Sequence, residues 1–130
     1  MSPAFKCALI VDDDPIQLEL LDNMLRLRGV AAVMKAGDGK SAKALVSQHG
    51  AQIDLITTDL NMPDFDGVEF LTYLAGVNFA GKFAIISGAV PTVAAAAAKL
   101  ATVYRLDFIG FLKKPVTAAG LDSLLSGAGK

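Results

Sequence analysis

The chain has 130 residues, of which 53% are hydrophobic and 19% are charged, and its formal net charge is −1. The length suits a single domain spanning residues 1–130 with a core over about residues 5–126, and the net charge gives no electrostatic sign of direct nucleic-acid binding. No apolar stretch approaches the roughly 20 residues that span a bilayer, and the first residues lack a signal-peptide pattern, so we expect a cytoplasmic protein with no membrane partner.

Five short apolar segments recur along the chain, and each is predicted to form a buried strand. Several are apolar at nearly every position rather than at alternating ones, which is typical of a parallel sheet covered by helices on both faces. The only cysteine, Cys7, lies in the first segment and is expected to be a small buried side chain. The predicted strands are Cys7–Val11 and residues 30–34, 53–57, 83–86 and 108–112.

Helix signals fill the intervals between these strands. In the first interval, Asp14 is placed to cap free backbone amides, Pro15 suits the first helical turn, and Gly29 is a natural stop. The other helices are predicted over residues 40–49, from Gly67 with Asp66 as its cap, after Pro91, and after Thr117. Strand and helix alternate five times, which predicts a doubly wound α/β fold: a five-stranded parallel sheet with right-handed crossovers and helices on both faces.

Polar residues stand where the predicted strands end. Asp12 and Asp13 follow the first strand, and Asp59 follows the third. Ser87 follows the fourth, and Lys114 follows the fifth. In an open α/β sheet the ligand site lies beyond the carboxyl ends of the strands, so these side chains should meet in one crevice. Three converging carboxylates repel one another, which a protein tolerates by protonation or by binding a cation. Mg²⁺ is the hard, oxygen-preferring ion that suits them.

The chain resembles the receiver domain of bacterial response regulators in four segments, which together span nearly its whole length. They are residues 9–15 (LIVDDDP), residues 59–67 (DLNMPDFDG), Ser87-Gly88 and Lys114-Pro115. The resemblance implies a flavodoxin-like sheet with strand order 2-1-3-4-5. It also implies that the chain is a phosphoacceptor of a two-component phosphorelay, which catalyses only its own phosphorylation and dephosphorylation and is not otherwise an enzyme.

The resemblance implies a role for each residue of the acidic cluster. Asp59 would accept the phosphoryl group from a phosphohistidine of a sensor histidine kinase or a phosphotransfer protein. Mg²⁺ would be bound by Asp13 and Asp59 through carboxylate oxygens, by the backbone carbonyl of Asn61, and by Asp12 through water. Asp14 also lies in the acidic run, but its place before Pro15 favours helix capping over metal binding.

The resemblance assigns the remaining site residues to the phosphoryl group and to the switch. Lys114 would supply a positive charge to one phosphoryl oxygen and Ser87 a hydroxyl donor to another. Phe111, three residues before the lysine, would turn inward after phosphorylation and change the output face. An ordinary core phenylalanine is the alternative interpretation of Phe111. Lys113, which adjoins Lys114, is expected to be a solvated charge.

The segment between Ser87 and Lys114 is longer than in most receivers, and here the chain resembles receivers joined to cyclic-di-GMP phosphodiesterase domains. A longer fourth helix is expected, and its run of small side chains, residues 94–98, would allow a homodimer. The output partner, or a fused effector domain, is not identified by the sequence.

Three other functions share this architecture. A degenerate receiver would act as an interaction module without phosphorylation. A phosphatase-like hydrolase with a nucleophilic aspartate would have a second aspartate two positions later, where this chain has Asn61. A flavin-binding electron carrier would have a hydroxyl-rich phosphate loop after the first strand, where this chain has aspartates that repel phosphate.

Overall fold

The computed structural model describes residues 5–60, 67–88 and 91–128. Strands and helices alternate along the chain, as the sequence predicts. The strands are β1 (Cys7–Val11), β2 (Ala32–Ala36), β3 (Leu55–Thr58), β4 (Lys82–Ser87) and β5 (Asp107–Lys113). The helices are α1 (Pro15–Leu27), α2 (Gly39–His49), α3 (Gly67–Gly76), α4 (Pro91–Val103) and α5 (Ala118–Ala128).

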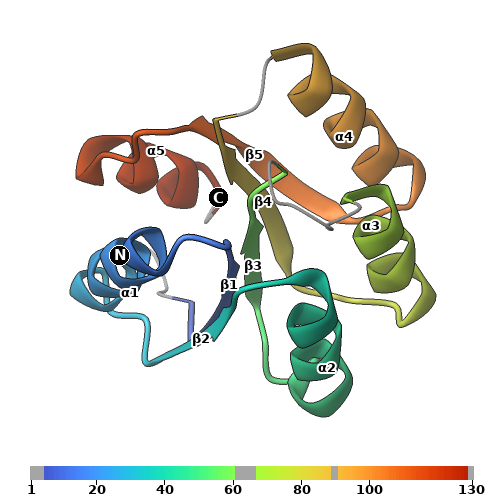
Figure 1. Cartoon of the computed structure of the whole chain (residues 1–130), viewed down its shortest axis with the longest axis horizontal. Helices are drawn as coiled ribbons and strands as arrows, with labels where there is room; N and C mark the ends of the chain where they lie inside the picture. The colour runs from blue at the N-terminus through green and yellow to red at the C-terminus, as the bar shows by residue number, and fades with distance from the viewer. Residues whose placement is uncertain (1–4, 61–66, 89–90, 129–130) are drawn as a thin grey trace.

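The five strands form one parallel sheet in the order β2-β1-β3-β4-β5, which confirms the predicted doubly wound fold. Helices α1 and α5 cover one face of the sheet, and α2, α3 and α4 cover the other (Figure 1). Because all strands run in the same direction, their carboxyl ends lie along one edge of the sheet. The strand order places β1 beside β3, and β4 between β3 and β5, so four of these ends are neighbours.

Two separate cores fill the space between the sheet and its two helical layers. On the side of α2, α3 and α4, large buried side chains such as Leu9, Phe70 and Phe83 pack together. On the side of α1 and α5, Ile10 and Leu55 pack against Leu21, Leu25 and Leu121. Successive residues of β1 thus enter opposite cores, which explains why this strand is apolar at every position. Cys7 is buried as expected, and burial raises the pKa of its thiol.

The prediction for β2 was displaced by two residues. The apolar segment begins at Val30, but the strand begins at Ala32, whose partner is Cys7 of β1. Val30 instead donates its backbone N–H to Leu25 and is buried in the core beside α1, where it helps to close the helix. β2 lies at an edge of the sheet and is only partly buried, so its hydrophobicity does not mark its boundaries as clearly as in β1.

The ends of α1 follow the chemistry of its terminal residues. Asp14 is the N-cap, and its carboxylate accepts a hydrogen bond of 3.0 Å from the backbone N–H of Ile16. The chain leaves the helix through Gly29, whose φ of +93° is favourable for glycine alone. Asp14 is therefore a capping residue, as predicted. The cap predicted for α3, Asp66, lies outside the described residues.

The alanine run of α4 is divided between core and surface. Ala97 is 8% exposed and belongs to the core on the side of α2, α3 and α4, whereas Ala95 and Ala96 are exposed. Only part of the run is therefore accessible for a helix of another chain. α4 itself has 13 residues and is followed by a turn in which Arg105 has a φ of +61°.

Candidate functional site

The carboxyl ends of β1, β3, β4 and β5 bring the predicted polar residues together. Backbone hydrogen bonds to the neighbouring strands fix the positions of Asp12 and Asp59. The N–H of Asp12 donates to the carbonyl of Ala36, and the N–H of Asp59 donates to the carbonyl of Val11. The backbone N–H of Lys114 donates to the carbonyl of Ser87 at 3.0 Å. The sheet therefore continues by one hydrogen bond beyond β1, β3 and β5, and these bonds set the positions of the side chains.

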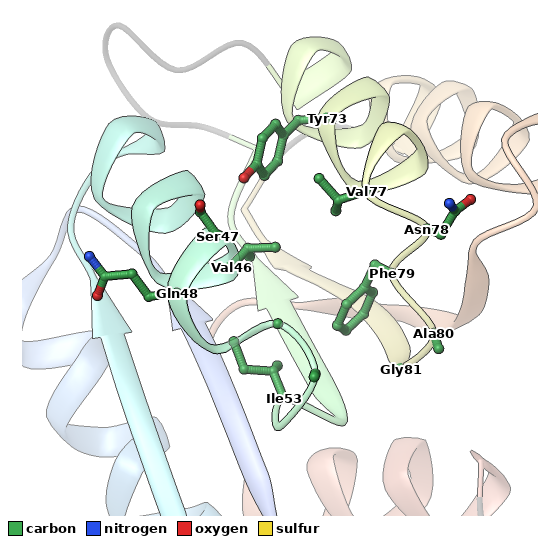
Figure 2. A pocket seen from close by; sticks show the side chains of 12 residues that line it. Val46, Ser47, Gln48, Ile53, Tyr73, Val77, Asn78, Phe79, Ala80 and Gly81 are labelled. Atoms are coloured by element: carbon green, nitrogen blue, oxygen red, sulfur yellow. The ribbon is translucent and has the colours of Figure 1, made fainter.

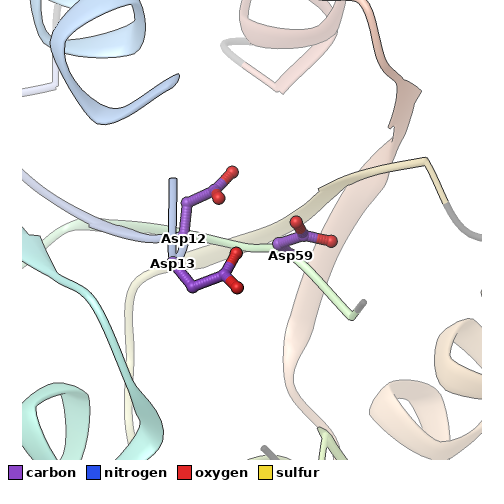
Figure 3. Close-up of side chains that lie close together, drawn as sticks. All are labelled: Asp12, Asp13 and Asp59. Atoms are coloured by element: carbon purple, nitrogen blue, oxygen red, sulfur yellow. The ribbon is translucent and has the colours of Figure 1, made fainter. Parts of the chain in front are cut away.

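Three carboxylates form the acidic part of the site. Asp12, Asp13 and Asp59 each place a carboxylate oxygen within 4.8 Å of the others (Figure 3). Asp12 and Asp59 are buried, whereas Asp13 is exposed. The convergence predicted for these three residues is therefore confirmed. Asn61, the fourth predicted metal ligand, lies outside the described residues.

Lys114 lies between the two buried aspartates. Its Nζ is 2.6 Å from Oδ2 of Asp12 and 2.7 Å from Oδ2 of Asp59. The lysine side chain is 22% exposed, while the two carboxylate side chains are 2% and 5% exposed. Burial lowers the pKa of Lys114, but its hydrogen bonds to the two carboxylates outweigh this effect and raise the pKa above its ordinary value. The ammonium is thus firmly charged and offsets part of the negative charge in the site.

The ionised form of Asp12 is less favourable than that of an ordinary aspartate, because its pKa is raised. Burial raises its pKa, and the nearby Asp59 carboxylate adds to this effect. Two hydrogen bonds oppose it: the one from Lys114 and a 2.9 Å bond from the backbone N–H of Asp14. The net result is a raised pKa, which identifies the site as one where a further positive charge would be stabilising.

Ser87 completes the surroundings of Asp59. Its hydroxyl donates to Oδ1 of Asp59 at 2.6 Å and accepts a 3.3 Å bond from the backbone N–H of Leu60. The serine is fully buried. One oxygen of Asp59 therefore contacts Ser87 while the other contacts Lys114. The contact of the Leu60 N–H was not expected from the sequence, because a backbone donor carries no residue-type signal.

The donor chemistry of the aspartate cluster fits Mg²⁺. This ion takes oxygen ligands and binds through one or two protein carboxylates, with waters filling the remaining positions. Asp13 and Asp59 offer such oxygens, and the exposure of Asp13 leaves room for water molecules on its side. Softer metals prefer histidine or cysteine ligands, and neither residue type occurs among the three that cluster here.

Phe111 lies two residues before the end of β5 and is half-buried. It packs at the margin of the core on the side of α2, α3 and α4. Lys113 is exposed, as expected for a solvated charge, and its neighbour Lys114 is the lysine that reaches the aspartates. The peptide bond between Lys114 and Pro115 is cis.

A surface cavity of about 670 Å³ lies away from this chemistry, between the carboxyl-terminal ends of α2 and α3. Its lining includes Val46, Ile53, Tyr73, Phe79 and Gly81 (Figure 2). Ile53 lies two residues before β3 and Gly81 directly precedes β4, so the cavity is at the amino ends of these strands. It contains none of the residues of the aspartate site, which lies at the opposite edge of the sheet.

Comparison with known proteins gives consistent results for sequence and structure. The family model "Response regulator receiver domain" matches residues 8–126. The two-component response regulator ORR24 of rice is 41% identical over 63 residues, which are 48% of this chain and 10% of that protein. The cyclic di-GMP phosphodiesterase RocR of Pseudomonas aeruginosa is 29% identical over 121 residues, 91% of this chain and 30% of that protein.

A solved response regulator from Colwellia psychrerythraea superimposes with a TM-score of 0.78 and 28% identity, covering 96% of this chain and 97% of that one. The chain spans less than a third of the length of the curated relatives named above. The match to RocR agrees with the likeness to receivers joined to cyclic-di-GMP phosphodiesterase domains. Among the described helices, none has the length and apolar character needed to cross a bilayer.

Proposed function

Because the chain belongs to the response regulator receiver family of two-component systems, we propose that it is a phosphorylation switch in which Asp59 accepts the phosphoryl group. The observation that carries this proposal is the orientation of the Asp59 carboxylate, whose two oxygens contact Ser87 at 2.6 Å and Lys114 at 2.7 Å. A buried carboxylate held by one hydroxyl and one ammonium is oriented for nucleophilic attack, and the same two donors can later bind phosphoryl oxygens.

The proposed donor is a phosphohistidine on a sensor histidine kinase or a phosphotransfer protein. A carboxylate oxygen of Asp59 forms a bond to phosphorus while the bond from phosphorus to the histidine nitrogen breaks. The bonding electrons return to the imidazole, which takes up a proton from solvent or a neighbouring group. The product on this chain is an acyl phosphate, and hydrolysis by water later restores the carboxylate.

Charge compensation decides whether this transfer is feasible, because an anionic nucleophile must approach an anionic phosphoryl group. Mg²⁺, when bound, would supply positive charge next to the phosphoryl oxygens. Asp12, Asp13, Asp59 and the backbone carbonyl of Asn61 are the proposed metal ligands. Lys114 adds a second charge, and we propose that its ammonium and the Ser87 hydroxyl stabilise different phosphoryl oxygens.

The test is incubation of the protein with acetyl phosphate, with and without Mg²⁺, followed by intact mass measurement. Asp13→Asn is expected to slow phosphoryl uptake by about 100-fold or more at limiting Mg²⁺. The substitution removes a carboxylate ligand and so weakens binding of the cation whose positive charge stabilises the transferring phosphoryl group. Asp14→Asn is the matched control, since Asp14 caps α1 and its asparagine is also a good cap.

Equal rates in Asp13→Asn and the wild type, or uptake that does not depend on Mg²⁺, would contradict the proposed metal role. A wild-type protein that gains no phosphoryl mass under any of these conditions would favour the alternative function, a degenerate receiver that acts as an interaction module. These two outcomes are separate, because the first concerns only the metal and the second concerns the acceptor itself.

Phe111 is the proposed switch residue. It lies between the core and the surface, three residues before Lys114, so a movement of the site would reach it through a short stretch of β5. Phe111→Ala is expected to leave the phosphoryl mass gain intact and to remove most of the phosphorylation-dependent change in hydrogen exchange of α4. An unchanged α4 response would show that Phe111 is an ordinary core residue.

We propose that residues 1–130 form one receiver domain, that it acts in the cytoplasm, and that it passes its signal to a protein partner or a fused effector domain. Its own catalysis is limited to gaining and losing the phosphoryl group. The exposed part of the alanine run on α4, Ala95 and Ala96, is where a phosphorylation-dependent homodimer would form. Light scattering of the phosphorylated protein tests this, and a monomer would contradict it.

A further inference from the structure

The strand that carries Phe111 and Lys114 is interrupted by a β-bulge. Pairing between β4 and β5 runs from Phe83 opposite Phe108 directly to Ala84 opposite Gly110, so Ile109 is an extra residue. Gly110 has a φ of +148°, a backbone conformation that other residues adopt only with strain. A bulge bends its strand and breaks the regular ladder of hydrogen bonds. β5 is also at the edge of the sheet, and within the described part of the chain no strand pairs with its other side.

The bulge determines which core each side chain of β5 enters. Phe108 and Phe111 both pack on the side of α2, α3 and α4, whereas Ile109 and Leu112 both pack on the side of α1 and α5. In a regular strand, residues three apart point to opposite faces. The extra residue therefore allows both phenylalanines to share one face. The bulge therefore sets the face of the sheet on which Phe111 packs.

Behind the bulge, α5 rests on β5 through two reciprocal contacts between a leucine and a glycine. A Cβ atom on Gly110 would lie 2.7 Å from Cδ1 of Leu124, so the leucine of the helix sits directly over the backbone of the strand. A Cβ atom on Gly120 would lie 3.0 Å from Cδ1 of Leu112, so the leucine of the strand sits over the backbone of the helix. These close contacts tie α5 to the part of β5 that lies beyond the bulge.

We infer that Gly110 and Leu124 are positioning residues that make α5 follow the state of Asp59, an inference that rests on the proposed phosphorylation. Lys114 Nζ contacts Asp12 and Asp59, and the acyl phosphate moves negative charge away from the Asp59 carboxylate and farther out of the sheet. Lys114 follows that charge. The segment 110–114 turns at the bulge, where the ladder is weakest, and α5 turns with it through Leu124 and Gly120.

The alternative is that α5 is a passive cover of the sheet. The two ideas differ in what they require of Leu124. If α5 only covers the core, its response to phosphorylation depends on the buried residues Leu121 and Leu125 and not on the half-buried Leu124. If α5 is driven by the bulge, removing the Leu124 side chain takes away the contact that lies directly over Gly110 and weakens the coupling of α5 to β5, while leaving the aspartate site untouched.

The experiment measures hydrogen exchange of α5 peptides and intact mass on the same samples, with acetyl phosphate and Mg²⁺ present or absent. In the wild type, phosphorylation is expected to change the exchange rate of α5 amides by about fivefold. Leu124→Ala is expected to keep the phosphoryl mass gain and to reduce the α5 change to less than about twofold. Leu124→Met, which retains most of the contact, is expected to restore the wild-type response.

Leu100→Ala is the matched control, because it removes the same atoms from another half-buried leucine, on α4 at the opposite face of the sheet. It is expected to leave the α5 response unchanged. An α5 response in Leu124→Ala equal to that of the wild type, or no α5 response in a wild type that does gain phosphoryl mass, would overturn this inference alone. A wild type without any phosphoryl mass gain would overturn the proposed function together with it.

Discussion

Asp59→Asn is expected to abolish the phosphoryl mass gain completely under conditions in which the wild type is phosphorylated. An amide oxygen is a very poor nucleophile, and its product would not be a stable acyl phosphate, so no slower version of the same reaction remains. Asparagine has nearly the same shape as aspartate, and its amide oxygen can accept a hydrogen bond from Ser87 or Lys114. The measurement is intact mass after incubation with acetyl phosphate and Mg²⁺.

The control for this experiment is another aspartate associated with the sheet. Asp107 begins β5, is 51% exposed and pairs with Lys82 at the far end of the strands. Asp107→Asn removes the same charge without touching the site and is expected to keep the full mass gain. Phosphoryl uptake by Asp59→Asn equal to that of the wild type would mean that the acceptor is another residue, and peptide mapping would then locate it.

Asp59→Asn should also be at least as stable as the wild type when no metal is added. It removes one of two negative charges that lie close together in buried positions, and the raised pKa of Asp12 reflects burial together with this repulsion. Urea denaturation measures the free energy of unfolding of both proteins. A stable, folded Asp59→Asn protein that is not phosphorylated separates loss of the nucleophile from loss of the fold.

Lys114→Met is expected to lower the free energy of unfolding by about 3 kcal/mol at neutral pH in the absence of Mg²⁺. The methionine keeps the apolar length of the side chain but leaves the buried carboxylates of Asp12 and Asp59 without their shared ammonium. Breaking a buried ion pair from one side is costly because the remaining charge stays desolvated. We place the loss at the lower end of the usual range because Lys114 is 22% exposed.

The matched control is Lys113→Met, one residue earlier in the chain and exposed. It is expected to change stability by less than about 0.5 kcal/mol. Added Mg²⁺ should recover part of the loss in Lys114→Met, because a cation bound by the aspartates compensates the same charges. Equal stability of the two variants would contradict the charge-balancing role of Lys114.

The stability loss of Lys114→Met should depend on pH in a defined direction. Burial raises the pKa of Asp12 in the folded protein above its ordinary value of 3.8, and the Lys114 contact lowers it, so removing the lysine raises it further. When the pKa of a carboxyl group is higher in the folded protein than in the unfolded chain, protonation stabilises the fold. This stability is fully present below the pKa of the unfolded chain and is lost as the pH rises through the pKa of the folded protein.

The difference between Lys114→Met and the wild type should therefore be largest at neutral pH and shrink as the pH falls toward 3.8. Lys114 itself stays protonated throughout this range, since its pKa is raised above 10.5. Urea denaturation of both proteins across this pH range measures the difference. A difference that is constant with pH would mean that the loss comes from packing and not from charge.

The architecture and the position of the site could be predicted because both depend on patterns that the sequence displays directly. Strands buried on both faces, such as β1, are apolar at every position, and polar residues directly after them must lie at the carboxyl edge of a parallel sheet. The strand order 2-1-3-4-5 came from the family resemblance, since hydrophobic periodicity does not specify which strands are neighbours. Strand boundaries were less predictable: Val30 belongs to the closing turn of α1 and not to β2, and β3 begins at Leu55 and not at Ile53.

The sequence by itself determined which residue types stand at the strand ends: the acidic pair Asp12 and Asp13, the acceptor candidate Asp59, and the single lysine before proline. Only the tertiary structure decided that Lys114 bridges Asp12 and Asp59, that Ser87 holds the other Asp59 oxygen, and that β5 is bulged beneath Leu124. The physical reason is that these contacts join residues far apart in the sequence. Composition and periodicity report the local environment of each residue, whereas a hydrogen bond between residues 102 apart, or a leucine seated on a distant glycine, exists only once the sheet and its helices have packed.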